Sequence, residues 1–265
     1  MESGKLAIIG GGKLGSALAE GMIRAGLIAE YRIHITRRNA ELLKPLADKG
    51  LITGSDNIAA VKDASIVFLA VKPWQVEEVL GSLVDSLAPS AVIISLAAGV
   101  SLKKLQEASG DRFTVFRAIP NTAVAVCESV TAVCSVNASE GDIKLVGSLF
   151  SGLGIVEFIP EDKINAATVL ASCGTAFALR YIRAAVEAGV EIGLSPETAV
   201  NMVAQTVKGA ARLLLDGDAH PEAEIDKVTT PGGVTIAGLN AMEHAGFSSS
   251  IIKGINAAFR KTENK

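Results

Sequence analysis

Three glycines near the N-terminus have the spacing of a phosphate-binding turn. Gly10, Gly12 and Gly15 form a G-x-G-x-x-G pattern that directly follows the apolar run Leu6–Ile9 and opens a helical pattern. In this context Gly10 permits a tight turn, Gly12 lets the backbone approach a pyrophosphate, and Gly15 lets helix and sheet pack closely. The N–H groups at the helix start would face the anion. We therefore expect a dinucleotide here; the alternative is a glycine-rich turn without a ligand. The residues expected to bind are Gly10, Gly12, Lys13, Leu14 and Gly15.

The polar residues that end the next apolar run indicate which dinucleotide would bind. A site for NAD usually carries an Asp or Glu about 20 residues after the glycines, where it holds the ribose 2′-hydroxyl. Here the strand ends in Thr36, Arg37 and Arg38, whereas Glu30 lies before the strand. A hydroxyl and two guanidinium groups suit a 2′-phosphate. We expect NADPH, with NADH as a weaker cofactor; the alternative is a solvated surface pair of arginines.

Three later turns should border the same ligand, because ligands of open α/β sheets bind beyond the carboxyl ends of the strands. The first contains Ala70, Val71, Lys72 and Pro73, and Pro73 suits the first turn of a helix. Lys72 could donate a proton in catalysis or place a charge near the phosphates. The second role is favoured, because no neighbouring group in the sequence would make this side chain an acid.

The other two turns contain small or polar residues. The stretch Ser95–Val100 has small side chains, Ala97 among them, on which a nicotinamide ring could lie flat. Asn121 offers an amide after the following strand, and Thr122 a hydroxyl. Ordinary loop chemistry is the alternative for both turns.

A stretch rich in threonine and glycine near the C-terminus predicts an anion receptor of a second kind. An apolar run with helical spacing resumes after Gly233, at Ile236, Leu239 and Met242, so residues 230–235 should form a turn that leads into a helix. Gly232 and Gly233 would expose bare N–H groups there, which suit a small carboxylate. Thr235 places a hydroxyl beside that receptor, where it could donate to a ring nitrogen. The alternative is an interhelix turn capped by threonine.

Short apolar runs alternate with helical patterns through the first 160 residues. Continuous apolar runs suit strands that are buried on both faces of a parallel sheet, and their alternation with helices predicts a doubly wound α/β, Rossmann-type domain. Two further segments, Ser129–Val136 and Gly154–Ile159, flank the helical pattern Ser139–Ser151 and should extend the sheet. The other expected strands are Leu6–Ile9, Arg32–Thr36, Ile66–Ala70, Ala91–Leu96 and Thr114–Ala118, with helices at Lys13–Ala25, Pro73–Leu83 and Leu102–Ala108.

After residue 160 the pattern becomes helical throughout. Residues 161–193 contain no proline and would form one long helical stretch, about 50 Å in length if unbroken. This stretch is apolar on more than one face, so other helices should cover it, including those of a second subunit. We therefore expect a dinucleotide-binding domain at 1–160 and an all-α substrate and dimerisation domain at 161–265. Further helices are expected at Pro196–Leu215, Thr235–Ala245 and Ser248–Lys261.

Composition and charge exclude several classes of function. The net charge of −3 gives no electrostatic argument for nucleic acid or a membrane surface. The 3 cysteines and 3 histidines have no metal-ligand spacing, so no metal is expected. Neither the N-terminus nor the apolar run 166–179 has the pattern of a signal peptide or a membrane span. A cytoplasmic protein is expected.

These motifs, in this order, resemble the pyrroline-5-carboxylate reductase family over nearly the whole chain. The specific match is Asp226–Leu239, and the glycine turn is shared with many dehydrogenases. Also similar are Ala70–Pro73, Ser95–Gly99 and residues 120–122. The chain differs from the usual family pattern at Ala123 and Thr175, where the family has proline.

The resemblance implies a Rossmann domain and a helical domain whose long helices intertwine in a homodimer, which often assembles further into a decamer of five dimers. It implies that Asn57 lies near the adenosine ribose and that residues 71–73 line the cofactor. It also implies that the Thr235 hydroxyl meets the imine nitrogen of the substrate. The substrate carboxylate would be held by Thr230, Gly232, Gly233, Val234 and Thr235.

The expected reaction is the reduction of 1-pyrroline-5-carboxylate to L-proline by hydride transfer from NADPH. An iminium is already electrophilic, so positioning would suffice without a strong acid. One alternative is a reductase of a related cyclic imine. A dehydrogenase of β-hydroxy acids would need a lysine in the long helix, which has Lys163 at its start and none from there to Gly193. A dinucleotide-sensing protein without catalysis is the non-enzymatic alternative.

Overall fold

The computed structural model describes residues 4–217 and 219–263, and the chain divides into two compact units. The first unit comprises the described residues up to Cys173 together with Thr262 and Glu263, and the second is Gly174–Lys261. Each unit is described by itself below.

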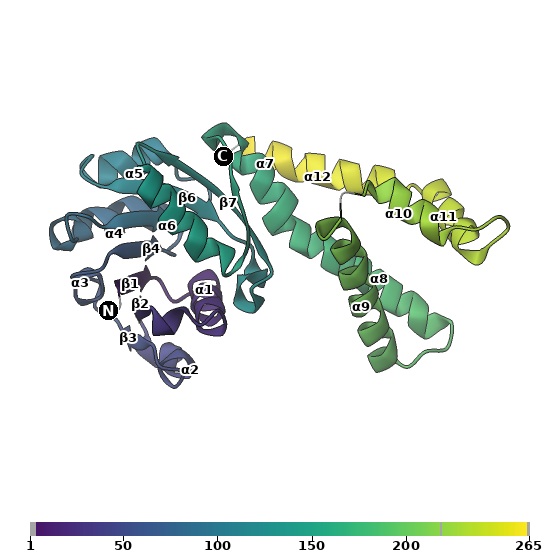
Figure 1. The fold of residues 1–265 in the computed structure, drawn as a ribbon, viewed down its shortest axis with the longest axis horizontal. Coiled ribbons are helices and arrows are strands. Elements are labelled where there is room, and N and C mark those ends of the chain that lie inside the picture. Colours follow the sequence, from purple (N-terminus) through teal and green to yellow (C-terminus); the bar gives the residue numbers. More distant parts are fainter. Residues whose placement is uncertain (1–3, 218, 264–265) are drawn as a thin grey trace. The chain divides into compact units, whose positions relative to one another are not determined.

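The first unit is built on an 8-stranded sheet of order β3-β2-β1-β4-β5-β6-β7-β8 (Figure 1). The first six strands in the chain pair in parallel, β7 pairs antiparallel to β6, and β8 pairs parallel to β7. This order confirms the doubly wound domain, and the two late segments extend the sheet as expected. The strands are β1 (Gly4–Ile9), β2 (Tyr31–Thr36), β3 (Ile52–Gly54), β4 (Ile66–Leu69), β5 (Val92–Ser95), β6 (Thr114–Ile119), β7 (Ser129–Val136) and β8 (Gly154–Phe158).

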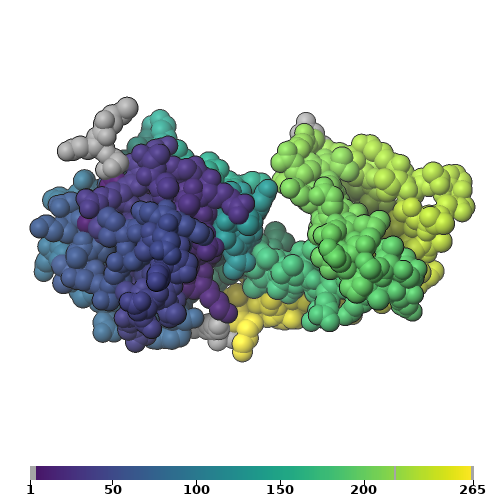
Figure 2. Space-filling model, turned by 90° about the horizontal axis from the view of Figure 1, so that it is seen from below, coloured from purple at the N-terminus to yellow at the C-terminus, as the bar shows by residue number. Residues whose placement is uncertain are grey.

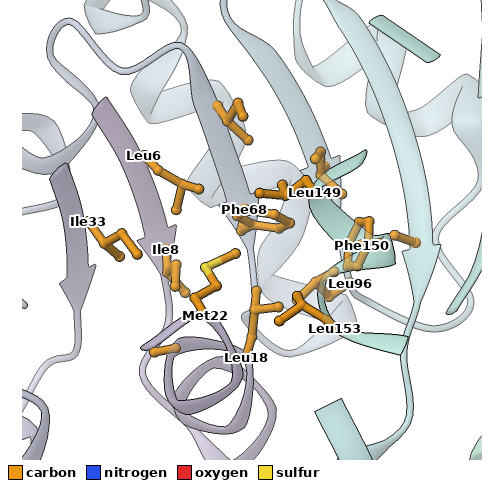
Figure 3. Close-up of a cluster of buried hydrophobic side chains, with 14 of the residues drawn as sticks. Leu6, Ile8, Leu18, Met22, Ile33, Phe68, Leu96, Leu149, Phe150 and Leu153 are labelled. Atoms are coloured by element: carbon orange, nitrogen blue, oxygen red, sulfur yellow. The ribbon is translucent and has the colours of Figure 1, made fainter. Parts of the chain in front are cut away.

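Helices cover both faces of this sheet and bury two apolar clusters. One cluster lies under α1 and α6 and includes Leu6, Met22, Phe68 and Phe150, with the Phe68 and Phe150 rings edge to face (Figure 3). The other lies under α3, α4 and α5. Figure 2 shows one outer face of the first unit, coloured purple to teal. The helices of this unit are α1 (Lys13–Arg24), α2 (Lys44–Ala47), α3 (Asn57–Val61), α4 (Val76–Leu83), α5 (Leu102–Ala108), α6 (Glu140–Ser151) and α7 (Ile164–Ala167).

Residues 161–173 are helical but pack with the first unit. Ile164 joins the cluster under α5, and Val169 is buried as well. The sequence predicted one long helical stretch from residue 161, and the structure interrupts its α-helical part with a π-helical segment at Thr168–Cys173, between α7 and the next helix. Such segments interrupt the regular hydrogen-bond ladder of an α-helix and are frequent at functional sites.

The second unit consists of helices whose apolar side chains are largely exposed. Leu179, Ile192, Met202 and Leu213 are all exposed, and Ile192 reaches 81%. By length and composition the helical stretch 161–191 could cross a membrane, and 6% of its most apolar window is buried within the described chain. An apolar helical surface of this size requires a cover. The helices are α8 (Gly174–Glu191), α9 (Pro196–Leu215), α10 (Pro221–Val228), α11 (Val234–His244) and α12 (Phe247–Glu263).

Candidate active site

The glycine turn between β1 and α1 has the geometry that a bound pyrophosphate needs. Gly10 has φ +112°, and a Cβ on it would lie 2.6 Å from the carbonyl oxygen of Ala70. A Cβ on Gly15 would collide with the carbonyl oxygen of Gly10. Gly12 differs, because nothing lies within 4 Å of its Cβ position and the residue is exposed. The backbone around Gly10 and Gly15 thus leaves no room for a side chain, whereas the space beside Gly12 is empty. At Gly12 α1 begins without a side-chain cap.

The end of β2 is bonded to this turn and to α3. The Thr36 hydroxyl donates to Oδ1 of Asn57 (2.6 Å), which begins α3. The carbonyl oxygen of Thr36 accepts from the backbone N–H of Gly11 (2.6 Å), and Arg37 Nη1 donates to the carbonyl oxygen of Gly11 (3.0 Å). Arg38 is exposed. The structure thus brings Thr36, Arg37 and Asn57 together with the glycine turn, and one arginine faces solvent.

The turns after β4 and β5 lie at the same carboxyl edge of the sheet. A Cβ on Gly10 would meet the backbone of Ala70 and the Val71 side chain, which places the turn after β4 against the glycine turn. Lys72 and Pro73 are exposed, and Pro73 starts a short 3₁₀ helix that leads into α4. After β5, Ala97 is buried and its N–H donates to the hydroxyl of the buried Ser95 (3.4 Å).

The turn after β6 is fixed by its own polar side chain. Asn121 Oδ1 accepts from the N–H of Ala123 (3.0 Å), and Nδ2 donates to the carbonyl oxygen of Ala171 (3.5 Å). A proline at position 123 would have no N–H to make the first of these bonds. The amide of Asn121 therefore holds the protein's own backbone, and its backbone N–H donates to the Ser129 hydroxyl (3.2 Å).

The expected carboxylate receptor forms the start of α11 in the second unit. Gly232 has φ +71°, and Gly233 is the N-cap residue of α11. Among the described residues no side chain caps this helix, so the alternative of a threonine cap is not what the structure has. A Cβ on Gly233 would collide with the Thr230 hydroxyl. Val234 and Thr235 occupy the first turn and are exposed, which leaves the helix N-terminus open to an anion.

Two sets of site residues therefore emerge, one in each unit. The residues expected to bind a dinucleotide lie after the carboxyl ends of β1, β2, β4, β5 and β6, except Asn57, which begins α3. The carboxylate set gathers around one helix N-terminus. Ser95, the first residue of the turn expected to border the nicotinamide, is fully buried, and its hydroxyl binds the backbone N–H of Ala97.

An apolar hollow of about 620 Å³ lies within the second unit. Its walls come from α8 and α9, with Met242 of α11 and Phe247 of α12. The Tyr181 and Phe247 rings lie edge to face, 6.3 Å between centroids. The hollow contains no cluster of ionisable groups, so it has the character of a packing surface.

Comparison with known proteins gives two family matches. Residues 161–265 match the model described as pyrroline-5-carboxylate reductase dimerisation. Residues 5–99 match the model described as NADP oxidoreductase, coenzyme F420-dependent.

Individual relatives match over nearly the whole chain. Pyrroline-5-carboxylate reductase 2 of Dictyostelium discoideum is 40% identical, covering 97% of this chain and 91% of that protein. Pyrroline-5-carboxylate reductase 1 of the same organism is also 40% identical, covering 94% of this chain, and this chain spans about half (48%) of its length. The crystal structure of Plasmodium falciparum pyrroline carboxylate reductase with NADP bound has a TM-score of 0.86 at 30% identity, covering 100% of this chain and 98% of that one.

Proposed function

Because the chain belongs to the pyrroline-5-carboxylate reductase family, we propose that it reduces 1-pyrroline-5-carboxylate to L-proline with NADPH, the last step of proline biosynthesis. The chain is an NAD(P)H-dependent oxidoreductase with an N-terminal Rossmann-like domain. The observation that carries the proposal for this substrate is the uncapped start of α11, which combines free N–H groups with the Thr235 hydroxyl in one turn.

The residues of the first unit fit a dinucleotide with a 2′-phosphate. The open space above Gly12 admits the pyrophosphate, and the start of α1 supplies N–H donors at Lys13 and Leu14. Thr36, Arg38 and Asn57 would surround the adenosine ribose and its phosphate. Ala70, Val71, Lys72, Pro73 and Ala97 would line the remainder, while Asn121 would shape the edge of the nicotinamide site. When bound, NADPH supplies the hydride for the C=N carbon.

The second unit would hold the substrate at the carboxylate receptor. Backbone N–H groups after Gly232 and Gly233 would bind the carboxylate, with Thr230 fixing the turn from behind. The ring nitrogen lies one bond from the carbon that bears the carboxylate, so anchoring the carboxylate brings the nitrogen within reach of the Thr235 hydroxyl. That hydroxyl would orient the imine and would stay hydrogen-bonded to the ring nitrogen while the imine is reduced to an amine. Catalysis would then depend on excluding water from the site and on a short distance between the nicotinamide and the C=N carbon. It would not need a strong acid.

The assembly that we propose is a homodimer formed through residues 161–265, with further association into a decamer of five dimers. The description of the matched dimerisation model and the exposed apolar helices α8 and α9 support a protein cover for this surface. A second copy would also fill the hollow beside Met242 and Phe247. We propose residues 1–160 as the dinucleotide-binding domain.

A cytoplasmic location is part of the proposal. The free thiols of Cys127, Cys134 and Cys173 suit a reducing compartment. A small-molecule substrate is the expected partner, without nucleic acid, membrane or metal.

The decisive assay follows NADPH oxidation at 340 nm on addition of 1-pyrroline-5-carboxylate to the purified chain, with proline identified by mass spectrometry. Turnover with β-hydroxy acids and NADP⁺ but none with the imine would favour the dehydrogenase alternative. Preference for a six-membered cyclic imine would favour a related reductase. Tight NADPH binding without turnover of any of these would favour a sensor.

A further inference from the structure

The short helix α3 is tied to the sheet of the first unit at both of its ends. At its start, Oδ1 of Asn57 accepts a hydrogen bond from the Thr36 hydroxyl at 2.6 Å. At its end, Nζ of Lys5 donates to the carbonyl oxygens of Ala59 (3.0 Å) and Lys62 (2.5 Å). Lys5 lies on β1 and Thr36 ends β2, so the two strands that α3 contacts supply one tie each.

The two ties lie at opposite ends of one face of the sheet. Side chains alternate between the two faces of a strand, so Lys5 and Ile9 of β1 share a face, and Ile9 is in register with Thr36 of β2. On this face Ala60 and Val61 of α3 are buried in the apolar cluster that includes Ile9. The start of α3 therefore lies at the carboxyl edge of the sheet, and its end lies toward the opposite edge.

Helix α3 is too short to fix its own position. It has 5 residues, and helices shorter than about 12 residues are marginal in water unless tertiary contacts hold them. Its N-cap is local, because Oδ1 of Asp56 accepts from the N–H of Ala59 (3.1 Å). The amine of Lys5 satisfies carbonyl oxygens that the end of a helix leaves free, and the helix dipole favours a cation at this end. Loss of this amine would release one end of α3.

The side chain of Asn57 is the group whose place would change. It is partly exposed, and the Thr36 hydroxyl occupies its Oδ1. The Nδ2 atom of Asn57 has no partner among the described residues, so its N–H groups remain for a ligand oxygen. A hydrogen bond weakens steeply as its length and angle depart from the optimum. The affinity for a ligand bound at Nδ2 therefore depends on where α3 lies.

We propose that Lys5 is a positioning residue for NADPH: by holding the end of α3, it sets where Asn57 presents its amide to the adenosine ribose. The inference rests on the proposed place of Asn57 beside that ribose. Lys5 itself would not touch the cofactor, since the length of α3, about 7 Å, separates the two ties. Every contact in this chain of effects lies within the first unit.

The test measures the dissociation constant of NADPH by titration calorimetry, without the imine, for the full-length parent and its variants. Asn57→Ala should raise Kd roughly three- to tenfold, as loss of one hydrogen bond to the ligand would cause. Lys5→Met should raise Kd roughly threefold or more, while the buried Ala60 and Val61 keep the protein folded. Lys5→Arg should restore most of the affinity, because a guanidinium can donate to both carbonyls. At saturating NADPH, kcat should stay parental in Lys5→Met.

The double variant distinguishes positioning from a separate effect of Lys5. If Lys5 acts through Asn57, Lys5→Met should add nothing once Asn57 is alanine, and the Kd of the double variant should lie within about twofold of that of Asn57→Ala.

Lys62→Met is the matched control. It removes a lysine charge at the same end of α3 and keeps the carbonyl oxygen that Lys5 binds, and the Lys62 side chain is exposed. It therefore accounts for the general attraction between a lysine and the anionic cofactor, and it should bind NADPH as the parent does.

Three results would overturn the inference: parental Kd in Lys5→Met, an undiminished effect of Lys5→Met in the Asn57→Ala background, or an equal rise of Kd in Lys62→Met. If Lys5→Met does not fold, Lys5→Gln replaces it in each comparison, because its shorter side chain cannot reach both carbonyls. Parental Kd in Asn57→Ala would contradict the proposed place of Asn57 and, with it, the inference. A parent that binds NADPH without reducing the imine contradicts the proposed reaction instead, and the binding test still decides on Lys5.

Discussion

The guanidinium of Arg37 donates a hydrogen bond to the carbonyl oxygen of Gly11, with Nη1 and the oxygen 3.0 Å apart. The N–H of Gly11 donates in turn to the carbonyl oxygen of Thr36, so the end of β2 and the glycine turn are bonded in both directions. Arg38 follows directly and is exposed. Two adjacent arginines thus have different surroundings: Arg37 is hydrogen-bonded to the glycine turn, whereas Arg38 is exposed and is the one that we propose for the 2′-phosphate.

This difference predicts separate effects of the two arginines on cofactor use. Arg38→Ala should raise the KM for NADPH about tenfold or more and leave that for NADH nearly unchanged, because a bond to a charged group contributes about 1.5–3 kcal/mol. Arg37→Ala should raise both KM values, since it loosens the turn that binds the pyrophosphate of either cofactor. Initial rates with each cofactor measure this. Equal effects of Arg38→Ala on the KM values for NADPH and NADH would contradict a role of Arg38 in binding the 2′-phosphate.

Thr235→Ala should lower kcat/KM for the imine roughly ten- to a hundred-fold. The hydrogen bond to the ring nitrogen is expected to contribute about 1–3 kcal/mol, and each 1.36 kcal/mol is tenfold. Thr235→Ser should retain most of the activity, because it keeps the hydroxyl. NADPH affinity, measured by fluorescence, should hardly change.

Thr229→Ala is the control for a nearby hydroxyl. Its side chain donates to the carbonyl oxygen of Asp226 at the end of α10, so its loss should leave kcat/KM close to the parental value. Parental turnover by Thr235→Ala would show that another group holds the imine.

Met202→Glu should prevent dimerisation and abolish activity. Met202 is 55% exposed on α9 and lines the apolar hollow, so a second copy would bury it, and a buried carboxylate without a partner is strongly unfavourable. Asn201→Glu adds the same charge at the neighbouring exposed position and should remain a dimer. Light scattering at micromolar concentration gives the mass of each. A parent that is an active monomer would contradict the proposed interface.

The stability of the chain should decrease as the pH falls below about 7, in part through His34. Burial lowers the pKa of His34 from 6.5, with Lys5 and Arg32 acting in the same direction, and its Nε2 is buried without a partner among the described residues. The unfolded chain then binds the proton more readily than the folded chain as the pH falls through 6.5. The contribution of neutral His34 to the free energy of unfolding is therefore present in full above that pH and decreases as the pH falls below it.

Urea unfolding at pH 7.5 and 5.5 measures this dependence, and His34→Gln should flatten it. The control variant is His244→Gln, which replaces a histidine in the last turn of α11 and should leave the pH dependence as in the parent. An unchanged pH dependence in His34→Gln would assign the effect to other groups.

Local signals in the sequence predicted the glycine turn, most of the strands and the start of α11. Each depends on neighbours in the chain: a glycine pattern between strand and helix, continuous apolar runs, and a helical period that resumes after Gly233. Short elements were missed because they carry too few residues for a period, as with β3 at Ile52–Gly54. The helix α10 was also missed, although Pro221 at its first turn and the acidic residues Glu222 and Glu224 are helix-start signals.

Contacts between residues distant in the chain were decided by the tertiary structure alone. The sequence by itself determined that the two arginines after β2 and the Thr235 turn were candidates for binding, because residue type and local spacing suffice for that. It did not separate Arg37 from Arg38, since this needs the position of the Gly11 carbonyl, 26 residues away. Nor did it indicate that Glu161 pairs with Arg117 or that residues 161–173 pack on the sheet. Those contacts depend on which strands become neighbours in the sheet. The order of the strands is fixed by burial of the whole core and not by a local sequence pattern.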